Sequence, residues 1–275
     1  MTFRPIPVGW TQEIKSLARI IFGFLLFRYG MEQVLGFPPA WVDAPTMSLF
    51  GLLKILSFPG GILIMLGLFN RPVTLVLSVA HFAYWLIEPF RGFLLGEIGL
   101  HGRGGLFGGG GAPSDPLLLP AFFLLYLFLT GPGVWSLDRL LKRDPGEPFD
   151  VRWVAYALGA LRIATGLMFF FHGLPKLIGW DPTTLRALAS VLEVGVGPIF
   201  VLGLFTRPLA FLLSGEMAFA YFINHWPERF WGSFVEPNQM AAIMNCFLFL
   251  FLWAAGPGAP SLDGLRKRGG ARPRR

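Results

Sequence analysis

Residues 162–180 read RIATGLMFFFHGLPKLIGW, an apolar run that carries His172 and Lys176. A run of about 20 mostly apolar residues is long enough to cross a bilayer as a helix. Residues 19–37 read RIIFGFLLFRYGMEQVLGF and align with this run without a gap. Positions that are identical in this alignment include Arg19/Arg162, Gly23/Gly166, Phe27/Phe170, Gly30/Gly173 and Gly36/Gly179. The sequence therefore predicts two copies of one membrane-spanning unit.

Two further landmarks repeat in the same order. GLFNRP at 67–72 returns as GLFTRP at 203–208, and GPGVWSLDRL at 131–140 returns as GPGAPSLDGL at 256–265. We predict a first four-helix repeat at 1–143, a second at 152–268 and a basic tail at 269–275. An even number of spans in each unit gives both units the same orientation, so the repeats are expected to be parallel.

The composition also indicates a membrane protein. Hydrophobic residues make up 54% of the 275 residues, charged residues 14%, and the mean hydropathy is +0.59, far from the balance of a soluble domain. No run resembles a removable signal, so the first apolar run is expected to remain as a span. The expected spans are 17–36, 49–69, 70–89, 116–131, 153–174, 188–205, 209–226 and 240–256. A single cysteine, Cys246, excludes an internal disulfide.

The basic residues indicate the orientation. With alternating spans, 16 of the 23 Lys and Arg residues lie on the side of the amino terminus. The positive-inside rule then predicts that both termini are cytoplasmic. The net charge of +7 does not indicate nucleic-acid binding, because the basic residues flank the spans. We expect the tail to bind anionic lipids, with a protein-binding tail as the alternative.

Several polar residues fall inside the second copy's spans. Counted from the cytoplasmic landmarks at 1.5 Å per residue, His172, Glu216 and Asn245 lie at depths of about 14–16 Å and Glu193 at about 21 Å. Ionisable groups in hydrocarbon are costly, so they are usually paired or functional. We expect these four side chains to meet near the middle of the membrane.

The first copy has a second candidate group. Arg28, Glu32 and His81 lie at estimated depths of about 14, 20 and 15 Å. Arg28 and Glu32 are four residues apart, so they can form a structural ion pair on one helix face.

Three interpretations of the second-copy group stay open: a structural hydrogen-bond network, a site that handles quinone or protons, and a path for a small molecule. A neutral histidine between two carboxyl groups can carry protons or hydrogen-bond a quinone oxygen. Pro175 is expected to end the fifth span, so Lys176 should snorkel to the outer interface rather than bind an anion. The residues lack the close His or Cys pairs of a metal site, and nothing local supports a haem between His81 and His172.

Other features have simple structural interpretations. The glycine-rich stretch 96–111 lacks the ending of a phosphate-binding loop and is expected to be a flexible linker. Gly23, Gly30, Gly166 and Gly173 are expected to let helices approach closely.

With these residues in view, the repeated unit resembles the DoxX family. The resemblance rests on Arg162-x3-Gly166, His172-Gly173-x2-Lys176, Glu193, Gly203-Leu204-x2-Arg207-Pro208 and the closing Gly256-Pro257-Gly258-x2-Ser261-Leu262-Asp263. In the first copy Tyr29 stands for the histidine, Gln33 for the lysine and Ser57 for the glutamate, while Arg19 and Asp138 remain. The resemblance therefore implies a scaffold half beside an active half.

The resemblance also implies a role. The family comprises small four-helix membrane proteins named after subunits of a thiosulfate:quinone oxidoreductase, which implies a bacterial or archaeal plasma membrane and a quinone-linked function. His172, Glu193 and Glu216 are then the catalytic candidates, and His172, Lys176 and Asn245 the residues expected to contact quinone. The expected partners are the lipid bilayer, a redox subunit and a second copy of the chain, without nucleic acid. The alternative is a non-enzymatic scaffold, assembly factor or carrier.

Overall fold

The computed structural model describes residues 9–37, 46–99, 118–144, 147–177, 185–225 and 237–270, and within them it contains helices and no β-strand. The helices of the first half are α1 (Thr11–Leu35), α2 (Leu49–Leu66), α3 (Asn70–Trp85), the π-helix η1 (Leu86–Phe90), α4 (Arg91–Leu94), α5 (Leu118–Thr130) and α6 (Leu137–Leu140). Those of the second half are α7 (Val151–Leu177), α8 (Leu185–Leu202), α9 (Thr206–Ala220), the π-helix η2 (Tyr221–His225), α10 (Pro237–Ala255) and α11 (Leu262–Gly270). Stretch 96–111, predicted to be a linker, lies mostly outside the described residues.

The prediction of an all-helical membrane protein is confirmed. Within the part of the chain that the structure describes, three helices are long and apolar enough to cross a bilayer, namely Leu49–Leu66, Asn70–Leu94 and Val151–Leu177. Shorter apolar helices cover Leu118–Thr130, Ala187–Leu202 and Ala241–Ala255. Helix α1 has 25 residues but carries three charged groups in its apolar part, Arg19, Arg28 and Glu32. The number of eight spans stays a prediction.

Prolines end helices less often than the sequence suggested. Pro175 lies inside α7, which continues to Leu177, and the third helix passes through Pro89 in η1 and on to Leu94. A proline removes one backbone donor, which costs little where only two helical residues follow, as after Pro175. Pro89 lies in η1, where the helix has a π-turn. A π-turn adds one residue to the helical turn, which lets the helix continue past the proline. The expected ends at residues 174 and 89 are therefore wrong.

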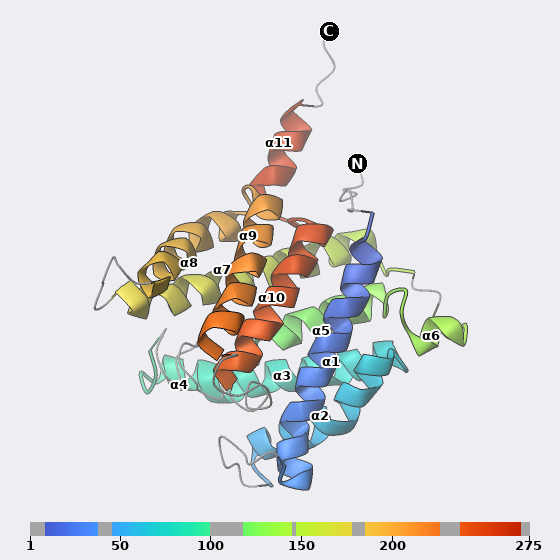
Figure 1. Cartoon of the computed structure of the whole chain (residues 1–275). Coiled ribbons are helices and arrows are strands. Elements are labelled where there is room, and N and C mark those ends of the chain that lie inside the picture. Colours follow the sequence, from blue (N-terminus) through green and yellow to red (C-terminus); the bar gives the residue numbers. More distant parts are fainter. Residues whose placement is uncertain are drawn as a thin grey trace.

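The helices pack in pairs within each half, and two further pairs join the halves. Helix α1 packs along α2, α7 along α8, α3 against α5 and α9 against α10. Between the halves α1 packs against α10 and α5 against α7, as the central helices of Figure 1 show. Near the start of α1, Oγ1 of Thr11 donates to the carbonyl of Ala254 at 3.2 Å.

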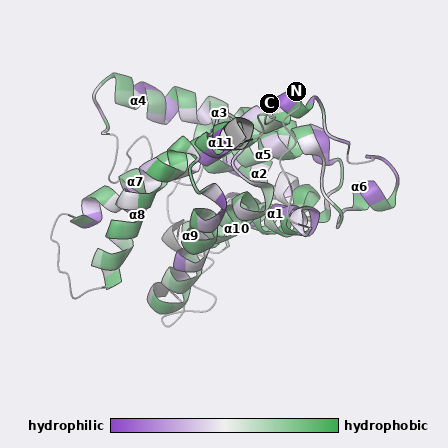
Figure 2. Cartoon of the chain, turned by 90° about the horizontal axis from the view of Figure 1, so that it is seen from above, coloured by the Kyte–Doolittle hydropathy of each residue, from purple (hydrophilic) through white to green (hydrophobic). Residues whose placement is uncertain are grey.

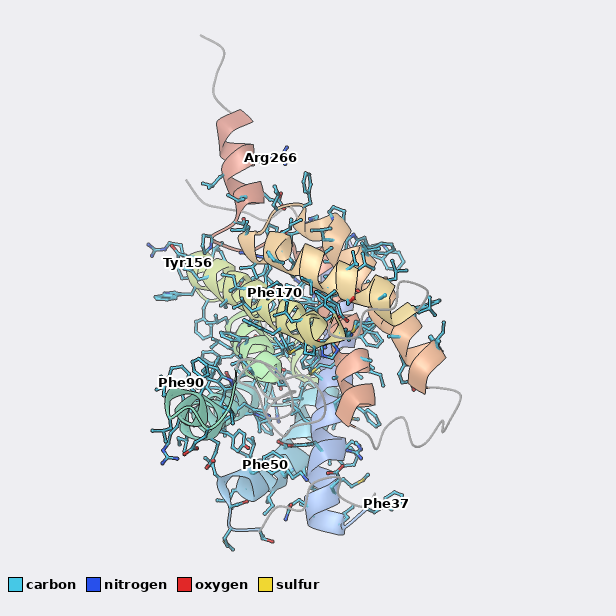
Figure 3. All side chains as sticks on the ribbon, turned by 90° about the vertical axis from the view of Figure 1, so that its left-hand side faces the viewer. Phe37, Phe50, Phe90, Tyr156, Phe170 and Arg266 are labelled. Atoms are coloured by element: carbon cyan, nitrogen blue, oxygen red, sulfur yellow. The ribbon has the colours of Figure 1, made fainter. Side chains whose placement is uncertain are left out.

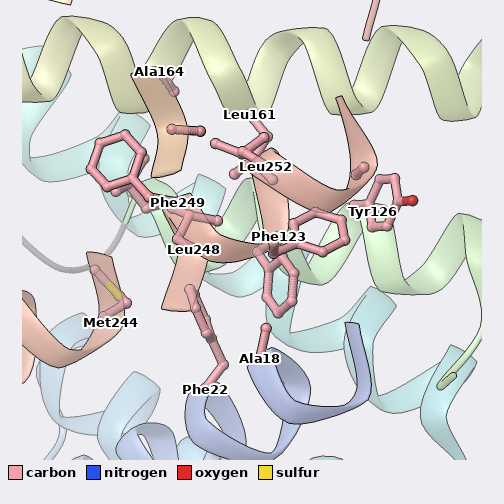
Figure 4. Close-up of a cluster of buried hydrophobic side chains, with 14 of the residues drawn as sticks. Ala18, Phe22, Phe123, Tyr126, Leu161, Ala164, Met244, Leu248, Phe249 and Leu252 are labelled. Atoms are coloured by element: carbon pink, nitrogen blue, oxygen red, sulfur yellow. The ribbon is translucent and has the colours of Figure 1, made fainter. Parts of the chain in front are cut away.

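One cluster of buried apolar side chains contains residues from both halves. Phe22 on α1 and Phe123 on α5 have ring centroids 4.3 Å apart, and Phe123 lies 5.4 Å from Phe251 on α10. Figure 4 shows these helices with Leu161 and Ala164 of α7 contributing from the other side. The two predicted repeats therefore share a core, beside which the first half has two smaller clusters of its own.

Glycines allow the tight packing inside each helix pair, as predicted. A Cβ atom on Gly23 of α1 would lie 2.6 Å from the backbone nitrogen of Met65 on α2. A Cβ on Gly166 of α7 would lie 2.8 Å from the side chain of Val201 on α8. These contacts leave no space for a side chain.

A buried arginine ties the helix ends together in the first half. Arg19 lies in the first turns of α1 and has no exposed surface. Its guanidinium donates to the carbonyls of Ile64 and Met65 at the end of α2, and to those of Pro132 and Trp135 after α5. A cation at the carboxyl end of a helix also interacts favourably with the helix dipole.

The second half has the same arrangement. Arg162, 1% exposed, donates to the carbonyls of Phe200 and Val201 at the end of α8 and to those of Pro257 and Pro260 after α10. Gly203 (φ 69°) leaves the space that the guanidinium fills, because a Cβ there would lie 2.8 Å from Nη1.

Two aspartates make a second matching contact. Asp138 accepts hydrogen bonds from the backbone nitrogens of Phe69 and Asn70 at 2.9 and 2.7 Å. Asp263 accepts from Phe205 and Thr206 at 3.0 and 2.9 Å. Each carboxylate thus binds the first free N–H groups of the third helix in its half.

Hydrophobic residues make up most of the long helices, and hydrophilic residues occur at α6 and in shorter stretches elsewhere (Figure 2). In Figure 3, Arg266 on α11 lies at one end and Phe37, just after α1, at the other. Helix α11 includes residues 269 and 270, so the predicted basic tail begins as a helix.

Candidate functional site

In the second half an ion pair joins α7 to α8. Nζ of Lys176 lies 2.5 Å from Oε1 of Glu193, whose side chain is fully buried. A Cβ atom on Gly173 would lie 2.8 Å from the Cβ of Glu193, so glycine is required for this approach. The expectation that Lys176 snorkels to the interface instead of binding an anion is wrong. A carboxylate within reach neutralises the ammonium, and each charge makes the other less costly to bury.

His172 and Asn245 lie at the same level of the bundle. The rings of Phe169 on α7 and Phe249 on α10 are 4.7 Å apart. The two helices run in opposite directions, because the chain just after α10 bonds to the first turns of α7. His172 follows Phe169 by three residues and Asn245 precedes Phe249 by four, so both lie about 4.5–6 Å farther along the bundle. Their predicted common depth agrees with this contact.

Glu216 on α9 faces the same region. Its carboxyl group interacts electrostatically with Glu193 and Lys176, which are on α8 and α7. Within the described ranges, however, no three His, Cys, Asp or Glu side chains lie close enough to hold a metal ion. We therefore describe a polar site spread over four helices instead of a compact cluster, and call it the α7–α10 site: His172, Lys176, Glu193, Glu216 and Asn245.

Four buried oxygen atoms of the α7–α10 site have no hydrogen-bond partner among the described residues. They are Oε2 of Glu193, both carboxyl oxygens of Glu216 and Oδ1 of Asn245. All four are acceptors, and Asn245 is only 5% exposed. A buried acceptor without a donor costs about 1–3 kcal/mol. The site is therefore suited to a ligand, or to protons, that supply hydrogen-bond donors.

The polar group of the first half contains a residue that the sequence analysis did not select. Arg28 and Glu32 form the predicted ion pair on α1. Lys54 of α2, 1% exposed, also binds Glu32, with Nζ 3.0 Å from Oε2. The sequence did contain a signal for Lys54, because it is a lone lysine in the apolar run 49–66. It contributed only to the count of basic residues that predicts the membrane orientation. His81 is fully buried on α3, where its Nδ1 lies 2.7 Å from the carbonyl oxygen of Leu77.

The two halves place opposite charges on equivalent helices. In the first half the carboxylate, Glu32, is on the first helix and the ammonium, Lys54, is on the second. In the second half the ammonium, Lys176, is on the first helix and the carboxylate, Glu193, is on the second. Aligning the two halves could not reveal this exchange of charges, because Glu32 and Lys54 do not align with Glu193 and Lys176.

Comparisons with known proteins agree with the resemblance seen in the sequence. The model of the DoxX family matches residues 157–226. A protein of Haemophilus influenzae described as uncharacterized is 36% identical over 123 residues, which are 39% of this chain and 89% of that relative. The inner membrane protein YphA of Escherichia coli is 36% identical over 118 residues, 37% of this chain and 84% of YphA. No solved structure matches the chain.

Proposed function

Because this chain belongs to the DoxX family and is a protein of the bacterial plasma membrane, we propose that it is the membrane subunit of a quinone-linked redox system. The α7–α10 site binds the head group of a quinol in this proposal. The electrons pass to a partner subunit that carries the acceptor.

The observation that carries the proposal is the set of unpartnered oxygens at Glu193, Glu216 and Asn245. A bound quinol supplies two hydroxyl groups, whose protons are released when its two electrons are removed. The carboxyl group of Glu216 accepts one hydroxyl hydrogen bond and then holds the proton. The ion pair with Lys176 balances the charge of Glu193 and uses Oε1 of its carboxylate. The other oxygen, Oε2, is then available to the ligand. His172 provides a further group that can transfer a proton at the same level.

A purely structural role is the second candidate, and the ion pairs favour it. Lys176–Glu193 joins α7 to α8, and Glu32–Lys54 joins α1 to α2. Such pairs can hold helices together in a scaffold, assembly factor or carrier without any turnover. This candidate predicts that replacing both His172 and Glu193 by apolar residues of similar size leaves the cellular phenotype intact.

The proposal includes a tandem duplication of a four-span unit with both termini in the cytoplasm. The matching contacts of Arg19 and Arg162, and of Asp138 and Asp263, support it. Reporter fusions after residues 36, 70, 131 and 256 test the topology. A cytoplasmic signal after 70, 131 and 256 and an external one after 36 are expected, and any other pattern contradicts eight alternating spans.

The ligand is tested by purifying the protein in mild detergent, extracting it with organic solvent and measuring co-purified quinone by absorbance and mass. Wild type is expected to retain quinone, while His172→Ala and Glu216→Gln lose it. Glu88→Gln is the matched control, because Glu88 is exposed in η1. Absence of quinone from wild type, or equal loss in the control, would reject the redox proposal in favour of the structural one.

A further inference from the structure

Several buried polar atoms of the first half have no side-chain or backbone hydrogen-bond partner among the described residues. Two of them are the hydroxyl of Tyr29 on α1 and Nε2 of His81 on α3. His81 has no exposed surface at all. Unpartnered polar groups are rare in folded proteins, and in a bilayer no bulk water is present to satisfy them.

The hydrogen-bonding role of His81 follows from its other nitrogen. Nδ1 lies 2.7 Å from the carbonyl oxygen of Leu77, which can only accept a hydrogen bond. Nδ1 therefore carries the proton of the neutral ring, and Nε2 is an acceptor. Like the oxygens of the α7–α10 site, Nε2 needs a donor. The hydroxyl of Tyr29 can serve as donor or acceptor.

Contacts on both sides of His81 show what it faces. Leu77, one turn earlier on α3, packs against Gly60 of α2. A Cβ atom on Gly60 would lie 2.6 Å from Cδ1 of Leu77. Tyr84, three residues later, has its ring 5.4 Å from that of Phe50 at the start of α2. His81 therefore faces the middle of α2. There Ser57 is fully buried but donates its hydroxyl to the carbonyl of Leu53, so it has no proton left for Nε2.

Aromatic side chains pack next to this position. The rings of Tyr29 and Phe50 lie 5.7 Å apart, and Tyr84 and Ala80 belong to the same buried cluster. Nζ of Lys54 lies 5.1 Å from the centroid of the Tyr29 ring while it binds Glu32. The nearby charges thus already form ion pairs, which favours a neutral aromatic ligand over an ion.

The first half, which its sequence suggested to be a scaffold, has a histidine, a lysine and a glutamate, three of the residue types of the α7–α10 site. Tyr29 replaces the histidine of the first helix, but His81 supplies one from the third helix. The Lys–Glu pair is present with its members exchanged between helices. The missing motif positions therefore do not show that the chemistry is missing.

We infer that the first half is a second binding site, in which a neutral aromatic head group with hydroxyl groups, of the quinol class, donates a hydrogen bond to Nε2 of His81 beside the hydroxyl of Tyr29. The choice of ligand class rests on the proposed function, whereas the location rests only on the contacts of the first half. One chain then binds two head groups, one in each half.

Stoichiometry tests this inference. Titration calorimetry of the whole protein in detergent, with a reduced short-chain benzoquinol under anaerobic conditions, is expected to give two sites per chain. Glu216→Gln should leave one site, His81→Phe should leave one site, and the double variant should leave none. Tyr29→Phe removes a single hydroxyl and should weaken one of the two sites about tenfold, the value of one hydrogen bond. The matched control is Tyr126→Phe, which removes a tyrosine hydroxyl from the shared core.

The outcomes separate the two proposals. One site that is lost in Glu216→Gln and unaffected by His81→Phe and Tyr29→Phe would overturn the second site and leave the proposed function intact. No binding to wild type would overturn both. An equal effect of Tyr126→Phe, or an experimental structure with benzoquinol present in which water alone joins Tyr29 to His81, would also overturn the second site.

Discussion

Replacing Arg162 by methionine should destabilise the protein strongly. The substitution keeps a long apolar side chain but removes the donors that reach four carbonyl groups. The carbonyl of Phe200 keeps its bond from the backbone nitrogen of Gly203 at 3.0 Å. The other three carbonyls lose the guanidinium, at about 1–3 kcal/mol each. The variant also avoids the cost of burying a cation, which offsets part of this loss. We therefore expect the free energy of unfolding to fall by about 3–5 kcal/mol, the lower end of the sum over the three carbonyls.

Thermal unfolding in mild detergent, followed by tryptophan fluorescence, measures this loss. At about 2–4 °C per kcal/mol for a chain of this size, the midpoint should fall by about 10 °C. Arg19→Met should give a similar decrease, because Arg19 makes the corresponding contacts. Arg152→Met is the matched control: its side chain is 83% exposed and pairs with Asp150 on the surface, so little change in stability is expected. A decrease no larger than that of the control would refute the reasoning, and a large difference between Arg19→Met and Arg162→Met would refute the equivalence of the halves.

Three further predictions use the same unfolding measurement. Gly61→Val should destabilise the α1–α2 pair by several kcal/mol, because a Cβ atom there would lie 2.3 Å from the backbone nitrogen of Phe27. The control Gly215→Val should have little effect, because no atom lies within 4 Å of a Cβ at that position. Equal effects of the two substitutions would contradict the close packing. Asp263→Asn weakens two bonds to the start of α9 and should cost about 1–2 kcal/mol, and an unchanged midpoint would argue against this cap. Burial lowers the pKa of Lys15, which precedes the first predicted span, from 10.5 to about 8. Between these two pH values the unfolded chain binds more protons than the folded chain does. The free energy of unfolding should therefore rise from pH 8 to 10.5 in wild type but not in Lys15→Met.

Part of the candidate site could be predicted from the sequence. Ionisable residues in apolar runs were recognisable because hydrocarbon excludes unpaired charge, and residue counting gave His172 and Asn245 a common depth that agrees with the Phe169–Phe249 contact. Depth along a helix follows from a constant rise per residue. The direction in which a side chain faces its neighbours does not follow from that rise, and for this reason Lys54 was missed and Lys176 was assigned to the wrong environment.

The sequence by itself determined the class of protein, the helical segments and the resemblance between the halves, because hydrophobic run length and local motifs are properties of the chain alone. It also indicated Arg162, Glu193 and Asp263 as important positions, but not what they contact. Only the tertiary structure decided that α1 packs against α10 and α5 against α7, so that both halves share one core. Only the tertiary structure showed, too, that Glu32 and Lys54 exchange the roles of Lys176 and Glu193. The physical reason is that an ion pair requires two charges at contact distance, and either helix of a packed pair can supply either charge.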